Sequence, residues 1–218
     1  EVEVQGEAVD SGYRTESTHS ATRTETPLRD IPQAITVVPE ALIEAQAAFS
    51  LRDALRNVPG LTLAAGEGGR TGDSITLRGF SANSDTYLDG VKDNGQYFRD
   101  TFFLEGVDVL KGPSSMLFGR GTTGGIVNLL SKQAHAGDDF SADLSLGSYD
   151  LRRLSADANL GNDQLAGRVS ALYHDADSFR DQNFLERKAI APAGRLQLGS
   201  DSFFTLQGLY QQEDSVFD

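Results

Sequence analysis

The sequence predicts two regions of different architecture: a small α+β domain over residues 27–133 and a run of antiparallel strands over residues 138–218. The chain has 218 residues, of which 39% are hydrophobic and 23 are glycine, a composition that suits many short strands and turns. The first region also carries two helix-start signals between short β-rich segments. The second region alternates apolar and polar residues with a period of two, which is typical of strands.

Composition excludes several classes of protein. The chain has no cysteine, so it has neither a disulfide framework nor a thiolate metal site. Its net charge of −13 argues against a nucleic-acid binder, which needs a basic face, and fits solvated loops and turns. No apolar run approaches the roughly 18 residues of a membrane helix. The opening stretch, EVEVQGEAVD, does not have the pattern of a signal peptide and is compatible with a mature N-terminus.

Residues 1–26 are expected to form a flexible N-terminal segment, because they are rich in Thr, Ser, Glu and Arg and form scarcely an apolar cluster. The exception is the short alternating stretch Glu1, Val2, Glu3 and Val4. An extended piece of this kind can add a strand to the sheet edge of a partner, although a frayed end has the same pattern.

Two helices are expected early in the α+β domain. Pro39 begins the first, which continues through EALIEAQAAF to residue 49. Ser50 begins the second, with Asp53 at the spacing of a capping box, and Pro59-Gly60 ends it.

Short strands and glycine-rich loops make up the rest of this domain, which is therefore expected to hold a small sheet. The strands are expected at 35–38, 61–64, 74–80, 107–111 and 126–130. Asp89-Gly90 predicts a tight hairpin between residues 86 and 92. The loops Gly66–Gly72 and Asn94–Thr101 connect these elements.

From residue 138 onward, apolar residues alternate with small or charged ones over about five strands, the pattern of an outer-membrane barrel. A soluble antiparallel sheet with one wet face gives the same alternation. The uninterrupted apolar face and a long polar connection over 174–188 favour the barrel. So few strands cannot close a barrel, so the sequence is expected to be the front part of a longer protein.

Motifs for enzyme chemistry are weak. Gly119–Gly124 matches the G-x-G-x-x-G spacing, but too few residues follow before the next strand signal to form the required helix. The histidines are far apart and no calcium-loop pattern surrounds the Asp residues, so no metal site is predicted. The constellation with more chemical content is Arg70 on one loop and Gln96, Tyr97, Phe98 and Arg99 on the other. Arginine beside aromatic rings suits an anionic aromatic ligand, while ordinary loop packing is the alternative.

Four motifs in order resemble the plug domain and first barrel strands of TonB-dependent outer-membrane receptors, in particular the ferric-siderophore group of the catecholate type. They are SLRDALRNVPGL (50–61), ITLRGF (75–80), YLDGV (87–91) and VDVLKGPSSMLFGRGTTGGIVNLLSK (107–132). The resemblance is strong over residues 27–133 and rests on pattern alone after 138. It implies an α+β plug with a small mixed sheet and short helices inside a barrel of about 22 strands.

The same resemblance implies a function. A receptor of this family is a transporter in the bacterial outer membrane rather than an enzyme, and iron(III) is its cargo as a siderophore complex, not an intrinsic cofactor. The loops carrying Arg70 and residues 96–99 are expected to face the ligand. Glu1–Val4 resembles a TonB box, the segment that binds the C-terminal domain of TonB. TonB in turn is energised by a complex in the inner membrane. Lipid and lipopolysaccharide are further expected partners, and nucleic acid is not.

Arg78 matches an arginine that, in this family, faces glutamates of the barrel wall, so it is expected to form an ion pair between plug and barrel. The glycines of residues 112–125 are expected to let the plug backbone approach that wall. The sequence does not identify the siderophore. A receptor for cobalamin or a glycan, or a signal transducer, remains open on the same fold.

Overall fold

The structure is a computed structural model that describes residues 12–63, 72–119, 122–180, 182–199 and 202–216. The described part forms two compact units, which we treat separately. The first holds the described residues up to 63 together with 72–101 and 106–130; the second holds 102–105 and those from 131 onward. Among the described residues, no helix is both long and apolar enough to cross a membrane.

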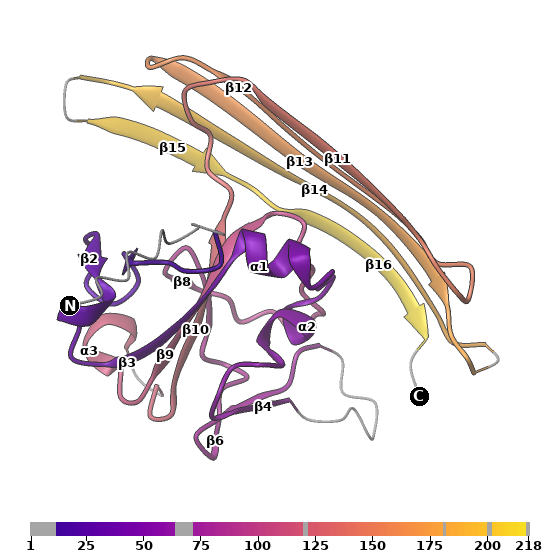
Figure 1. Cartoon of the computed structure of the whole chain (residues 1–218), viewed down its shortest axis with the longest axis horizontal. Coiled ribbons are helices and arrows are strands. Elements are labelled where there is room, and N and C mark those ends of the chain that lie inside the picture. The colour runs from indigo at the N-terminus through magenta and orange to yellow at the C-terminus, as the bar shows by residue number, and fades with distance from the viewer. Residues whose placement is uncertain (1–11, 64–71, 120–121, 181, 200–201, 217–218) are drawn as a thin grey trace, which may run out of the picture. The chain divides into compact units, whose positions relative to one another are not determined.

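A mixed sheet with the strand order β3-β9-β10-β7-β8 organises the first unit (Figure 1). Its strands are β3 (Ala34–Pro39), β9 (Leu104–Lys111), β10 (Gly125–Ser131), β7 (Thr86–Leu88) and β8 (Val91–Lys92). β3 runs antiparallel to β9, whereas β10 runs parallel to β7. The predicted hairpin is confirmed: Asp89 and Gly90 join β7 to β8 with φ angles of 50° and 79°, as a primed turn requires.

The helices of this unit are short. They are η1 (Leu28–Asp30), α1 (Glu40–Ala45), α2 (Leu51–Leu55) and α3 (Ser115–Phe118). The capping box that begins α2 is confirmed, since Ser50 Oγ accepts from the Asp53 amide at 3.1 Å and the Asp53 carboxylate accepts from the Ser50 amide at 3.2 Å. The first predicted helix ends earlier than expected because Ala47 has a positive φ of 46°, which takes the chain out of the helical conformation.

A second, three-stranded sheet has the order β4 (Leu61–Leu63), β5 (Ile75–Leu77) and β6 (Phe80–Ser81). The prediction of one continuous strand over residues 74–80 is wrong. Arg78 and Gly79 have φ angles of 51° and 85°, so they form a tight turn that folds β6 back on β5. A periodicity of two does not distinguish a strand from two strands joined by so short a turn.

The segment from residue 12 to residue 26, expected to be flexible, instead forms a short strand pair and enters the core. β1 (Ser17–Thr18) runs antiparallel to β2 (Thr26–Pro27). Thr18, Ser20 and Ala21 are all buried. Buried threonine and serine carry no hydropathy signal, so composition indicated a solvated segment.

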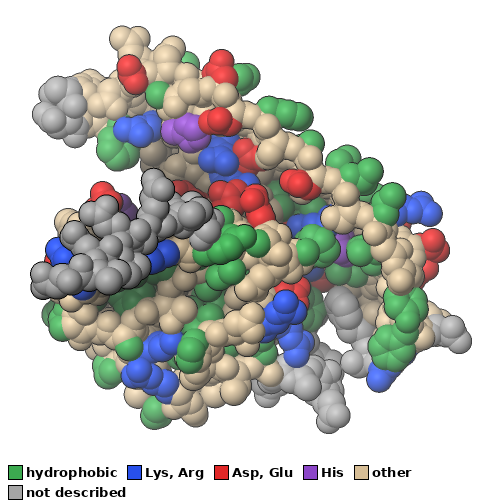
Figure 2. Space-filling view, in the orientation of Figure 1, with side chains coloured by type: hydrophobic (Ala, Val, Ile, Leu, Met, Phe, Trp, Pro, Cys, Tyr) green, Lys and Arg blue, Asp and Glu red, His purple; other side chains and the backbone are tan. Residues whose placement is uncertain are grey.

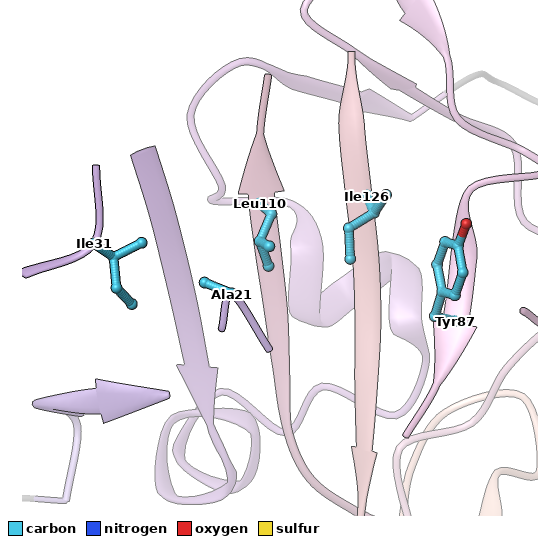
Figure 3. Packing of buried hydrophobic residues seen from close by; sticks show 5 residues of the cluster. All are labelled: Ala21, Ile31, Tyr87, Leu110 and Ile126. Atoms are coloured by element: carbon cyan, nitrogen blue, oxygen red, sulfur yellow. The ribbon is translucent and has the colours of Figure 1, made fainter. Parts of the chain in front are cut away.

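The core of the first unit lies on the central sheet (Figure 3). Leu110 of β9 and Ile126 of β10 are fully buried beside Tyr87 of β7, and Ala21 and Ile31 complete the cluster. The Tyr87 ring also meets the Phe118 ring edge-on, with 4.7 Å between centroids. The N-terminal segment and α3 are therefore held by the same apolar cluster that joins the strands.

Gly124 and Gly125 explain part of the glycine-rich stretch, by a different contact from the expected one. A Cβ on Gly124 would lie 2.4 Å from the carbonyl oxygen of Leu77, and a Cβ on Gly125 would lie 2.0 Å from that of Leu110. Gly125 also has a φ of 131°. From the sequence, these glycines are expected to let the plug backbone approach a barrel wall. The structure shows that they let β10 begin against the backbones of β5 and β9 within the same unit.

The second unit is an antiparallel sheet with the order β11-β12-β13-β14-β15, in which β16 also pairs with β14. Figure 1 shows its long strands side by side in one curved sheet. The strands are β11 (Asp139–Leu146), β12 (Arg152–Gly161), β13 (Leu165–Asp177), β14 (Phe184–Gln197), β15 (Phe203–Gln207) and β16 (Tyr210–Val216). Because β15 and β16 both pair with β14, the six strands fill five positions, which agrees with the predicted number.

The long polar connection predicted over residues 174–188 is wrong. β13 continues to Asp177 and β14 begins at Phe184, and residues 174–177 pair in register with residues 184–187, for example His174 with Arg187. The error arose because charged residues on one face of a strand resemble a loop in composition.

The two faces of this sheet differ in polarity. Figure 2 shows hydrophobic side chains on the surface of these strands. Exposed apolar side chains recur along them: Phe140, Leu144, Leu154, Leu160, Leu165, Val169, Tyr173, Ile190, Phe204, Leu206 and Tyr210. The alternate residues are mostly polar, charged or small, and several bond to one another; Arg168 Nε donates to Asp157 at 2.9 Å and Arg187 Nη2 donates to Glu213 at 2.7 Å. A water-soluble sheet buries its apolar face, so this polarity is that of a sheet facing lipid.

Candidate functional site

The loop between β8 and residue 101, predicted to face a ligand, is anchored at its far end to helix α2. The carbonyl of Arg99 accepts from the Leu51 amide, the first N–H of the helix, at 2.8 Å. Two residues later, the Thr101 hydroxyl donates to the carbonyl of Ala48 at 2.6 Å. The loop therefore ends at a fixed point of the first unit.

Arg99 is the centre of a buried ionic cluster. Its side chain is 3% exposed, and that of Asp73, the residue directly after the other predicted loop, is also 3% exposed. Arg99 Nη1 lies 3.2 Å from Asp73 Oδ2, and Nη2 lies 2.9 Å from Asp93 Oδ2. A guanidinium that bridges two carboxylates ties together the segments that carry them.

Backbone groups complete the coordination of Arg99. Its Nη2 donates to the carbonyl of Gly95 at 2.8 Å and its Nη1 to that of Tyr97 at 3.3 Å. Its own amide donates to Asp73 Oδ2 at 3.2 Å. The loop thus folds around the arginine side chain, and each of these contacts fixes a different residue of the loop.

Tyr97 belongs to the same cluster. Its hydroxyl donates to Asp93 Oδ2 at 2.8 Å, and its ring centroid lies 4.3 Å from the Arg99 guanidinium carbon. Burial raises the pKa of the Tyr97 phenol to about 12, opposed by Arg99 and reinforced by the hydrogen bond to Asp93. The phenol is therefore neutral at physiological pH and acts as a donor.

Two glycines are required for this packing. A Cβ on Gly72 would lie 2.7 Å from the amide nitrogen of Tyr97, and Gly72 has a φ of 95°. A Cβ on Gly95 would lie 2.8 Å from the Tyr97 ring. The Asp73 amide then donates to the carbonyl of Tyr97 at 3.3 Å. The structure therefore brings together the end of one predicted loop and the body of the other.

The predicted ligand contacts differ in exposure. Gln96 is exposed, Tyr97 and Phe98 are half-buried, and Arg99 is buried. Arg70 lies outside the described residues. Direct contact between Arg99 and a ligand would require its guanidinium to release at least one internal acceptor. The proposed TonB box, Glu1–Val4, also lies outside the described residues.

Arg78 is exposed on the tight turn between β5 and β6. Within the described part of the chain, no carboxylate lies within salt-bridge distance of it. Its positive charge acts on Lys111, whose pKa is lowered first by burial and then by Arg78. The ion pair with a barrel wall stays a prediction.

A second buried polar network was missed by the sequence reasoning. Asp108 of β9 is fully buried and accepts a hydrogen bond from the Thr18 hydroxyl. Asn128 of β10 donates to Ser20 Oγ at 2.9 Å and accepts from the Gly90 amide at 2.9 Å. The signal was present: Asp108 stands between the apolar residues Val107 and Val109, and a buried carboxylate needs partners.

Metal ligands do not cluster in the described residues: no group of three or more His, Cys, Asp or Glu side chains there is placed to hold an ion.

Comparison with known proteins assigns the family. Residues 27–126 match the family model described as the TonB-dependent receptor plug domain. The chain belongs to the TonB-dependent receptor family. The resemblance drawn from the four ordered motifs is thereby confirmed. Receptors of this kind combine a plug with a barrel, so the first unit corresponds to a plug and the second to part of a barrel wall.

Relatives of the chain are similar over both units. PiuA of Acinetobacter baumannii, described as a probable TonB-dependent siderophore receptor, is 38% identical over 88% of this chain and 26% of its own length. BfrD of Bordetella pertussis, a probable TonB-dependent receptor, is 40% identical over 96% of this chain and 28% of its own length. The chain therefore spans about a quarter of the length of these relatives.

Solved structures give the same result. The crystal structure of PiuA superposes with a TM-score of 0.86, at 33% identity over 94% of this chain and 30% of that one. The closed form of Fiu, the ferric-catecholate import receptor of Escherichia coli, superposes with a TM-score of 0.88, at 34% identity over 96% of this chain and 30% of that one.

Proposed function

We propose that the protein is an outer-membrane receptor that imports a ferric siderophore by TonB-dependent, energy-coupled transport. The observation that carries the proposal is that the similarity to PiuA and Fiu, named as siderophore receptors, extends over 94% and 96% of this chain. The apolar outward face of β11–β16 supports the location, since it suits lipid. The protein is a transporter and not an enzyme, and iron(III) is its cargo as a siderophore complex.

The experiment that tests this function is growth under iron limitation. The complete gene is expressed in a strain that lacks its other siderophore receptors, and single ferric siderophores are supplied as the iron source. We expect growth on at least one ferric catecholate, lost when TonB is deleted or the proton-motive force is collapsed. Growth on no ferric siderophore, with the protein present in outer membranes, would contradict the proposal.

We propose that the loops 66–72 and 94–100 face the siderophore. Arg70 of the first loop and Gln96, Tyr97 and Phe98 of the second would contact it. Replacing Arg70 by alanine is expected to weaken binding of an anionic ferric complex by about 1–3 kcal/mol, the worth of a charge-assisted hydrogen bond. Equilibrium binding of ferric enterobactin to the full receptor measures this. Arg56→Ala, which removes an exposed arginine of the same unit, is the control. Equal affinity of both variants and the parent would show that the barrel loops, and not Arg70, form the binding site.

Energy coupling is proposed to act through Glu1–Val4, which would bind the C-terminal domain of TonB as an added strand. Proline at Val2 or Val4 is expected to abolish transport and to leave siderophore binding unchanged, because proline removes a donor from the strand ladder. Uptake of radioactive iron measures transport, and equilibrium binding on the same cells measures siderophore binding. A Val2→Thr variant keeps the donor and is expected to transport. Normal uptake in both proline variants would place the TonB box elsewhere.

The remaining partners follow from the surface. The exposed apolar side chains of β11–β16 would contact outer-membrane lipid. Lipopolysaccharide would contact the ends of these strands that lie in the outer leaflet. Arg78, exposed on its turn, is proposed to pair with a carboxylate of the barrel wall. No basic face that would bind nucleic acid is expected at a net charge of −13.

A further inference from the structure

The contacts of Arg99 lead to a role different from ligand contact. We propose that Arg99 is a positioning residue: it holds the loop of residues 93–99 in shape and ties it to Asp73, and it does not itself touch the siderophore. The inference rests on the proposed function, because it assigns a task within that binding site.

The donors of the Arg99 guanidinium are already used inside the protein. Arg99 Nε donates to Asp93 at 2.9 Å, Nη1 to Asp73 at 3.2 Å and Nη2 to the carbonyl of Gly95 at 2.8 Å. All three nitrogens of the guanidinium are therefore engaged inside the protein. A ligand oxygen would have to displace one of these acceptors, which would then lose its hydrogen bond to a charged group. Such a bond is worth more than a neutral one, so the exchange is unfavourable unless the ligand fully replaces it.

The charges around Arg99 do not favour an anionic ligand. One guanidinium faces two carboxylates, Asp73 and Asp93, so the cluster as a whole is not cationic. Its field therefore offers no attraction to an anionic complex. The side chain is also 3% exposed, so a ligand at the protein surface does not reach it.

Arg99, Asp73 and Asp93 form a clamp that leaves two amide side chains of the loop at the surface. Asn94 and Gln96 are exposed, and each lies between residues that Arg99 or its partners hold. Asp93 and Gly95 flank the first, and Gly95 and Tyr97 flank the second. A clamped backbone with exposed amide side chains recognises oxygen and N–H groups by hydrogen bonding. Preorganisation of this kind raises affinity by reducing the ordering cost of binding.

Substitution by lysine and alanine separates positioning from direct contact. Lysine keeps the charge but cannot bridge two carboxylates as the planar guanidinium does. The full receptor is tested with ferric enterobactin, an anionic tris-catecholate, and ferrichrome, an uncharged tris-hydroxamate. If Arg99 positions the loops, Arg99→Lys and Arg99→Ala both raise the Kd of every complex that the receptor binds, by about tenfold or more. Arg56→Ala leaves it unchanged.

A double-mutant comparison adds a second readout. Asp93→Asn removes a partner of Arg99 without touching the arginine. Because both variants break the same clamp, the combined variant Arg99→Ala/Asp93→Asn is expected to lose no more affinity than the worse single variant. Retention of enterobactin binding by Arg99→Lys, or additive losses in the double variant, would overturn the proposal and show that Arg99 meets the ligand by charge.

Hydrogen exchange of the receptor without ligand tests the same clamp independently of any siderophore. Arg99→Lys is expected to speed exchange of the amides between residues 93 and 99, while those of β10 keep their protection. Unchanged exchange in the loop would overturn the proposal. If the receptor transports no ferric siderophore in the growth test but the loop loses protection in Arg99→Lys, the proposed function fails and the clamp stands, so the two failures are distinguishable.

Discussion

Replacing Gly125 by alanine is expected to destabilise the plug by about 3 kcal/mol or more, because the new methyl group has no space and the backbone has the wrong φ for an L side chain. The Cβ would lie 2.0 Å from the carbonyl oxygen of Leu110 and 2.6 Å from Leu77 Cδ2, and φ is 131°. The nearest atom is backbone in the central sheet, so no side-chain rotation relieves the clash. Hydrogen exchange of β9 and β10 amides in the full receptor measures the local free energy of opening.

The matched control separates the clash from the backbone conformation. Gly90 has a φ of 79° and no atom within 4 Å of its ideal Cβ. Gly90→Ala is therefore expected to cost only the conformational penalty, about 1–2 kcal/mol. Equal losses for the two variants would mean that the strands shift to accept a methyl group at Gly125. In that case the start of β10 is less tightly packed than its contacts indicate.

Local signals in the sequence predicted local structure well. Ser50 and Asp53 form their capping box and Asp89-Gly90 its turn, because each depends on a few neighbouring residues. The turn at Arg78-Gly79 was missed because a non-glycine residue with positive φ has no mark in an alternating pattern. The polarity of the strands after 138 was predicted, whereas the length of β13 and β14 was not. Their charged residues pair across strands, as Arg187 does with Glu213.

The candidate site was predicted less completely, since its chemistry depends on contacts between residues far apart in the sequence. Nothing in the sequence near Arg99 shows that its partner is Asp73, which is held next to the loop by a glycine with positive φ. Arginine beside aromatic residues therefore predicted a binding surface, and the structure shows a buried clamp among the same residues. The location of the site and the function of one of its members are separate inferences.

The polar network under the N-terminal segment gives the second large expected effect. Thr18→Val keeps the shape of the side chain but removes the hydroxyl that donates to Asp108 and accepts from the Ser20 amide at 3.0 Å. Asp108 is fully buried, and its Oδ1 has no hydrogen-bond partner in the described part of the chain. We expect a loss of about 2–4 kcal/mol, because a buried carboxylate is left with fewer partners. Faster exchange or proteolysis of residues 17–27 in the full receptor measures it.

The pH dependence of that loss identifies Asp108 as its cause. Burial raises the pKa of Asp108, opposed by the hydrogen bonds from Ser20 and Thr18 and by the charge of His19. A folded-state pKa above the unfolded one means that the native state binds the proton more tightly, so the penalty of the buried charge falls as pH falls towards the usual range of aspartate. Without the Thr18 hydroxyl the pKa rises further, and the defect of Thr18→Val is expected to shrink on acidification. In an Asp108→Asn background, Thr18→Val should cost less and show no such dependence. A defect that is equally large in both backgrounds, or constant with pH, would assign the loss to packing around Thr18 instead of the carboxylate.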